Sequence, residues 1–153
     1  MFDPHDLDPV TAAYHEAGHV MMARLLGGQV VLASIEGEHD DRHAGRTVVR
    51  WHGLAERERV RRSAMVALAG PVAENHWRGG TPWVEALDAW QADWIEVEAA
   101  LKAEADADDA LRRWLREVAL ELTDDAAWAH LCCIADALEA HGTLDEALLA
   151  ELQ

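Results

Sequence analysis

The chain is poor in several residue types, and each shortage excludes a class of protein. Two of its 153 residues are cysteine, and these are neighbours, Cys132 and Cys133. Within a helical pattern, adjacent side chains point about 100° apart, so these two thiols cannot join distant segments. A disulfide scaffold is therefore excluded. The cysteine content fits a reducing compartment, and we expect a cytoplasmic protein.

Long apolar runs are also missing. The sequence contains no stretch of about 18 apolar residues, which is the length that a transmembrane helix needs. The residues after Met1 do not show a positively charged start followed by an apolar run, which is the pattern of a secretory leader. The sequence therefore predicts neither secretion nor a membrane partner.

Basic residues are scarce: 13 Lys and Arg stand against 29 Asp and Glu, for a formal net charge of -16. The acidic residues are interleaved with apolar ones at helical spacing, which is typical of solvated helix faces. Nucleic acid is therefore not expected as a partner. One basic cluster could contact an acidic neighbour, but we favour a solvated helix face by about four to one; it comprises Arg57, Arg59, Arg61 and Arg62.

What is present indicates one folded domain. Half of the residues are hydrophobic and seven are tryptophan, which is too apolar for a disordered chain. The length is typical of a single domain with one core. No repeat, linker or low-complexity segment divides the sequence, so we predict a single domain over residues 1–153.

Hydrophobic periodicity predicts a mainly α (α+β) fold, a helical domain with a short β-hairpin after its first helix. Asp8 and Pro9 are the start signals of that helix, and Gly27 and Gly28 mark its end. We expect Gly70 and Pro71 to bend or divide the second helix. The predicted elements are a helix from 9 to 26, strands at 29–35 and 47–51, helices at 54–77, 83–105, 108–122 and 125–141, and a short final helix with a capping box of Thr143 and Glu146.

The first helix carries a metal-binding pattern. Residues 15–19 read His-Glu-Ala-Gly-His, an HExxH motif. Residues four apart lie on one face of a helix, so the imidazoles of His15 and His19 can converge on one ion. Glu16 lies about 100° further round, where its carboxylate can reach water at the metal without being a ligand. This position predicts a general base.

The alternative is that His15 and His19 are ordinary core or surface histidines. In a chain of this composition, the pattern would arise by chance about once in twenty cases. Here it lies within a capped amphipathic helix and includes Gly18, which costs about 1 kcal/mol relative to alanine. A glycine with this energetic cost indicates that another segment approaches the helix closely at this position. We favour the metal site by about five to one.

A zinc site with two histidines needs a third protein ligand. Periodicity does not choose among the later candidates. Asp88 and Asp93 each fall on an apolar arc of the predicted 83–105 helix, where a carboxylate is expensive unless it has a partner. The ligand types within reach are Glu74, His76, Glu85, Asp88 and Asp93.

Several segments together resemble the peptidase domain of the FtsH-type ATP-dependent membrane proteases. Residues 13–19 read Ala-Tyr-His-Glu-Ala-Gly-His, residues 45–47 resemble the family's Gly-x-Thr, and residues 69–74 resemble its Gly-Gly-Arg-Ala-Ala-Glu segment. Asp88, followed by Ala92, looks like the Asp-x-x-x-Ala of the family's third-ligand helix. The short match at residues 142–145 resembles the turn before its last helix.

The resemblance implies a zincin-like fold and a zinc centre held by His15, His19 and Asp88, with Glu16 as the catalytic base. Glu74 would orient a ligand histidine, although a solvent-facing helix carboxylate is an equally good interpretation. We expect neither the family's ATPase module nor its membrane anchor, and therefore ATP-independent action. The predicted function is a zinc metalloendopeptidase that hydrolyses short or unstructured polypeptides, and a homo-oligomer is compatible with the sequence.

Two other functions remain open at this point. One is a non-catalytic, metal-binding protein-interaction domain derived from the same peptidase fold, in which His76 or His52 closes the fourth zinc position. The other is an iron site, since two histidines and a carboxylate also suit that metal. Glu16 argues against iron, because an oxygenase needs no carboxylate base beside its ligands whereas a hydrolase does.

Overall fold

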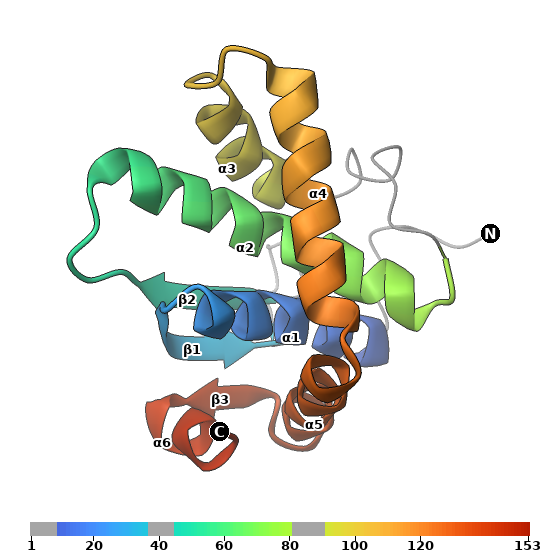
Figure 1. Cartoon of the computed structure of the whole chain (residues 1–153). Coiled ribbons are helices and arrows are strands. Elements are labelled where there is room, and N and C mark those ends of the chain that lie inside the picture. The colour runs from blue at the N-terminus through green and yellow to red at the C-terminus, as the bar shows by residue number, and fades with distance from the viewer. Residues whose placement is uncertain (1–8, 37–44, 81–90) are drawn as a thin grey trace.

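The structure is a computed structural model that describes residues 9–36, 45–80 and 91–153 of the chain. It confirms a mainly helical fold with a small antiparallel sheet. Helix α1 (Pro9–Leu25) lies at the centre and contacts α2, α4, α5 and the sheet (Figure 1). Its residues from Thr11 to Ala23 are buried with the exception of Tyr14. A helix buried on all sides needs apolar residues all round it, which is why α1 lacks the single polar stripe of a surface helix.

Gly18 explains how closely α1 and α2 approach each other. A Cβ at this position would lie 2.4 Å from the carbonyl oxygen of Ala69 and 2.6 Å from the Cβ of Ala73. No real Cβ fits there, so the two helices can cross at this distance only through a glycine. The expected close approach of another segment to Gly18 is confirmed.

The predicted hairpin is present and gains a third strand. Strands β1 (Gln29–Ser34) and β2 (Arg46–Arg50) pair antiparallel, with a register shift between Val30 and Leu32. Strand β3 (Thr143–Asp145) pairs antiparallel with the other edge of β1, so the strand order is β2-β1-β3. The sequence did not predict β3.

Strand β3 also corrects the predicted capping box. Asp145, not Thr143, caps α6 (Glu146–Glu151), because its carboxylate accepts from the backbone N–H of Leu148 at 2.9 Å. The hydroxyl of Thr143 instead pairs with that of Ser34 at 2.8 Å. Long-range pairing with β1 outcompetes the local capping pattern.

Helix α2 (Glu56–Trp77) is continuous, and Pro71 lies inside it. Of the two effects expected of Gly70 and Pro71, a bend or a division, the division is wrong. A proline inside a helix costs about 3 kcal/mol through the lost donor and its clash with the preceding turn. Here every residue from Ala64 to Glu74 is buried, so packing on both sides of the proline holds the helix together.

The remaining helices cover α1 and α2. Helix α4 (Ala107–Thr123) crosses α2, with α3 (Gln91–Leu101) beside its start and α5 (Asp125–His141) beyond its end (Figure 1). Caps match the predicted boundaries: Asp106 accepts from Asp109 N–H, and Asp124 accepts from Ala127 N–H. The described part of α3 ends at Leu101, four residues before the predicted end.

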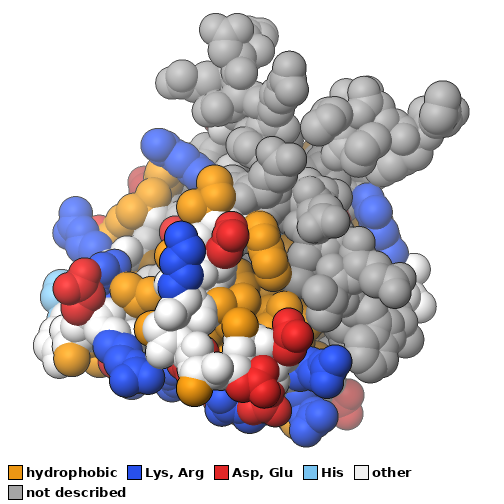
Figure 2. Space-filling model, turned by 90° about the horizontal axis from the view of Figure 1, so that it is seen from above, with side chains coloured by type: hydrophobic (Ala, Val, Ile, Leu, Met, Phe, Trp, Pro, Cys, Tyr) orange, Lys and Arg blue, Asp and Glu red, His pale blue; other side chains and the backbone are white. Residues whose placement is uncertain are grey.

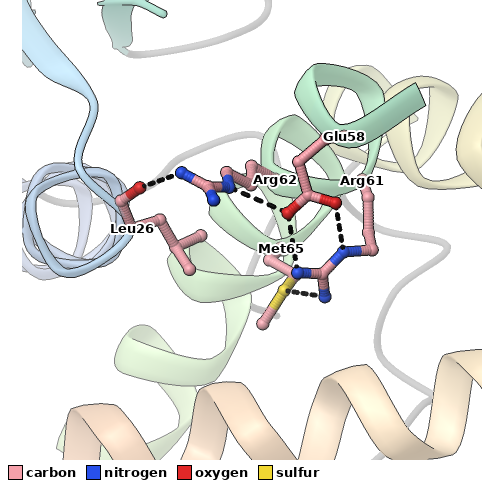
Figure 3. Close-up of polar contacts among 5 residues, drawn as sticks. All are labelled: Leu26, Glu58, Arg61, Arg62 and Met65. Atoms are coloured by element: carbon pink, nitrogen blue, oxygen red, sulfur yellow. Dashed lines mark hydrogen bonds and ion pairs between the residues drawn. The ribbon is translucent and has the colours of Figure 1, made fainter. Parts of the chain in front are cut away.

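The basic cluster on α2 is partly structural (Figure 3). Arg61 and Arg62 both bind the carboxylate of Glu58, each at 2.9 Å, which lowers the pKa of that carboxyl to about 2. Arg62 also donates to the carbonyl oxygen of Leu26 at 2.7 Å. The start of α2 is thereby tied to the end of α1, so these arginines do more than solvate a helix face.

The surface seen in Figure 2 is mixed in charge. Lys and Arg side chains lie beside Asp and Glu side chains, with hydrophobic side chains between them. This face is therefore not uniformly acidic despite the net charge of -16.

Both cysteines are free, as their position predicted. None of the described helices combines the length and the apolar character needed to cross a bilayer.

Candidate metal centre

Helix α1 presents His15 and His19 one turn apart on the same face. Their ring centroids are 4.7 Å apart and their planes are nearly perpendicular, at 81°. Both residues are buried, at 7% and 6% relative exposure. The spacing of four residues therefore brings the two imidazoles together, as the motif predicts. The two histidines are also largely screened from water.

A carboxylate from α3 reaches both imidazoles. Asp93 Oδ2 lies 2.9 Å from His15 Nε2, and Asp93 Oδ1 lies 3.4 Å from His19 Nε2. The ligand atoms of the three residues all lie within 4.8 Å of one another. Ligand atoms on a zinc tetrahedron with bonds of about 2.0–2.2 Å are about 3.3–3.6 Å apart. The three side chains therefore fit a zinc ion after small adjustments.

Asp93 is the carboxylate that the structure brings to the histidines, and it is one of the two that periodicity left open. Asp88, which the family resemblance favours, lies outside the described residues, as does Glu85. The role of Asp88 as a ligand remains a prediction. In the described part of the chain, His15, His19 and Asp93 form the group of potential ligands that could hold a metal.

The orientation of His19 is fixed from its other ring nitrogen. Its Nδ1–H donates to the carbonyl oxygen of Val66 on α2 at 2.6 Å. Because the carbonyl can only accept, Nδ1 carries the proton and Nε2 faces Asp93. Metal-ligating histidines are held by a contact of this kind, which selects the tautomer and aims the free nitrogen at the ion.

The electrostatics of the site favour a cation. Burial opposes the charged imidazolium of His19, but Asp93, with help from Glu16, raises the pKa of His19 to about 10. Burial likewise opposes the charged form of Asp93, yet the two imidazoles hold the pKa of its carboxyl well below the usual value. A positive charge is therefore stabilised between these side chains.

Gly70 makes room for this charge. A Cβ on Gly70 would lie 2.5 Å from His19 Nε2 and 2.7 Å from His15 Nε2. The backbone of α2 thus passes directly beside the two nitrogens that face the site, and any larger residue would fill the space between them. From the sequence, Gly70 was expected to help bend or divide the helix. Its position indicates instead that it keeps open the space beside the two histidine nitrogens.

Glu16 lies beside the histidines and is held by strand β2. It is buried, at 6% relative exposure, and its Oε2 accepts a hydrogen bond of 2.6 Å from Thr47 Oγ1. A Cβ on Gly45 would lie 2.8 Å from Glu16 Oε1. The carboxylate is therefore enclosed by Thr47 of β2 and by Gly45, the residue just before that strand, and is not free in solvent. The sequence did not predict a role for Thr47, because the contact between β2 and α1 joins segments that are far apart in the chain.

The remaining predicted residues lie around this group. Glu74 is buried at 1% relative exposure and its Oε1 lies 3.9 Å from an Arg78 guanidinium nitrogen, so the solvent-facing interpretation is wrong. Its role toward a ligand histidine remains a prediction. His52 bonds Gln29 at 3.0 Å, and His76 packs edge-on against Trp128 at 4.4 Å. Neither belongs to the metal-binding group found in the described residues.

Tyr14, next to the first motif histidine, anchors α1 on its other side. Its ring stacks on Trp77 of α2 at 4.9 Å and on Trp128 of α5 at 5.9 Å. Such aromatic contacts resist rotation of α1 about its axis, which would turn the motif histidines away from Asp93.

No protein-family model matches the sequence, and no curated protein matches it.

Proposed function

We propose that the chain is a zinc metallopeptidase. The observation that carries the proposal is the convergence of His15, His19 and Asp93 beside Gly70, with the buried carboxylate of Glu16 on the next position of the same helix. Two imidazoles and one carboxylate are the donor set of catalytic zinc sites, which keep one position open.

The carboxylate proposed as the third ligand is that of Asp93. Its two oxygens face both motif histidines at 2.9 and 3.4 Å. A zinc ion held by these residues would supply Lewis-acid chemistry, polarising a peptide carbonyl and lowering the pKa of water toward about 7. His19 keeps its bond to Val66 in this arrangement, which orients its Nε2 toward the ion.

Glu16 supplies the proton transfers. It accepts a proton from the attacking water and then passes it to the departing amine of the cleaved peptide bond. Its burial supports this role, because a carboxylate withdrawn from bulk water and held by one hydrogen bond keeps a fixed direction. A surface carboxylate would lose that direction to solvent.

The edge strand β2 is a suitable place for an extended substrate. It pairs with β1 on one side, and no other described strand pairs with it. A polypeptide can add to such an edge through backbone hydrogen bonds. Only extended chains can bind in this way, so we propose short peptides or unstructured segments as substrates. Because Thr47 on β2 touches Glu16, a chain on this edge would lie close to the base.

The motif resemblance supports the same function. We propose that the chain is a divergent relative of the FtsH-type peptidase domain, on the strength of residues 13–19 and the shorter matches that follow them. In this structure the Gly-x-Thr segment at residues 45–47 contacts Glu16 and the segment at residues 69–74 passes beside the histidines. Residues 13–19, 45–47 and 69–74 thus lie around one site.

Metal analysis and a cleavage assay on the same sample test the proposal. We expect about one zinc per chain and cleavage of casein, an unstructured protein, that a chelator abolishes and added zinc restores. Zinc binding without cleavage of casein or of a broad peptide library would instead favour the non-catalytic interaction domain. A chain that neither retains nor takes up zinc would overturn both interpretations.

A further inference from the structure

We propose that Thr47 is a positioning residue that holds the Glu16 carboxylate in its working direction. The inference rests on the proposed function, because it assigns a role to a residue that would act through the catalytic base. Its starting point is the bond from Thr47 Oγ1 to Glu16 Oε2, which at 2.6 Å joins side chains 31 positions apart.

The first step concerns the direction of the bond. A carboxylate can only accept, so the hydroxyl of Thr47 donates its proton to Oε2. A hydrogen bond to a charged acceptor is stronger than one between neutral groups. It fixes one oxygen of the carboxylate and hence the plane of the group, leaving Oε1 for the proton transfers.

The second step concerns Oε1. The backbone of Gly45 approaches this oxygen so closely that a Cβ there would lie 2.8 Å away, and Gly45 has a φ of 154°. The carboxylate is therefore confined on one side by a glycine and bonded on the other by Thr47. Gly45, the residue just before β2, and Thr47 within that strand thus limit the rotamers open to Glu16.

The third step concerns the rigidity of Thr47 itself. Thr47 is the register partner of Ala33 on β1, which is fully buried. The strand therefore holds the threonine backbone in place, and the branched Cβ restricts its χ1 rotation. The hydroxyl is presented to Glu16 from a fixed support, which is what a positioning residue requires.

A purely structural role is the alternative, in which the same bond ties β2 to α1 and affects stability only. The two roles differ in what Thr47→Val, which keeps the shape and removes the hydroxyl, should change. If Thr47 positions Glu16, kcat for casein-derived peptides should fall by about tenfold to a hundredfold. KM and zinc content should stay near those of the parent.

Two further variants sharpen the comparison. Thr47→Ser keeps the hydroxyl and should restore kcat to within about threefold of the parent. Thr123→Val is the matched control, because Thr123 is half-buried and its hydroxyl makes a bond of the same 2.6 Å length, to Ala119 O on α4. This control should leave kcat unchanged. An equal fall in kcat for Thr47→Ser and Thr47→Val, or a loss of Tm without a change in kcat, would overturn the positioning role.

A second readout separates this inference from the proposed function. In protein labelled with ¹³C at the glutamate carboxyl carbons, the Glu16 resonance is assigned by its loss in Glu16→Gln. We expect Thr47→Val to shift that resonance, and Thr47→Ser and Thr123→Val to leave it in place. If the parent cleaves nothing, the proposed function fails, and an unchanged Glu16 resonance in Thr47→Val would then also refute the contact.

Discussion

Glu16→Gln should lower the turnover of an unstructured substrate by about a hundredfold to ten-thousandfold, the range that a general base contributes. Glutamine keeps the length of the side chain and one carbonyl oxygen that can accept from Thr47. Both histidines and Asp93 stay in place, so zinc content and Tm should remain near those of the parent. Casein cleavage, with metal content measured on the same samples, checks this result.

Glu98→Gln is the matched control for this experiment. Glu98 lies on the exposed surface of α3, so its replacement removes one negative charge without touching the site. Its cleavage rate should equal that of the parent. If Glu16→Gln cleaves as fast as the parent, the hydrolysis arises from another site or from a contaminant, and the proposed role of Glu16 is wrong.

Asp93→Asn should weaken zinc binding by more than about a hundredfold, whereas Asp88→Asn should bind zinc nearly as tightly as the parent. Loss of a contact behind a ligand already costs up to about a hundredfold, and Asp93 is proposed as a ligand itself. An amide is a poorer zinc ligand than a carboxylate, and Asp93 is the one that faces both imidazoles in the structure. Competition titrations against a chelator of known affinity measure the difference.

The pair of variants is its own control, since each removes one carboxylate from the same stretch of chain. A large loss in Asp88→Asn with little change in Asp93→Asn would support the ligand that the family resemblance favours. It would also mean that the contacts of Asp93 with His15 and His19 only neutralise charge in the metal-free protein.

The sequence predicted the part of the site that depends on local spacing. His15 and His19 converge because helical geometry places residues four apart on one face. The hairpin of β1 and β2 follows from two short β-branched segments separated by a polar loop. Both features are set by neighbours along the chain, so periodicity was sufficient to find them.

The third carboxylate could not be chosen in this way. Asp88 and Asp93 each lie on an apolar arc of the predicted helix, and which arc faces α1 depends on how α3 packs. That packing is a long-range contact that no periodicity encodes. The contacts of Gly70 and Thr47 could not be predicted for the same reason, since each residue lies on an element that contacts α1 only in the folded chain.

The corrected elements also show tertiary contacts overriding local rules. Pro71 did not divide α2, because the buried residues on both sides of it hold the helix together. Strand β3 has three residues, which is too short for an alternating pattern to be recognised. Thr143 then bonds Ser34 on β1 and does not cap the helix that follows.

X-ray absorption at the zinc edge of the loaded parent protein tests the central claim most directly, because it reports the atoms around the ion. We expect a four-coordinate zinc with two imidazole nitrogens and two oxygen donors, one from a carboxylate and one from solvent, at about 2.0–2.2 Å. A protein that takes up no zinc, or a shell of four protein side chains that leaves no position for solvent, would contradict the account.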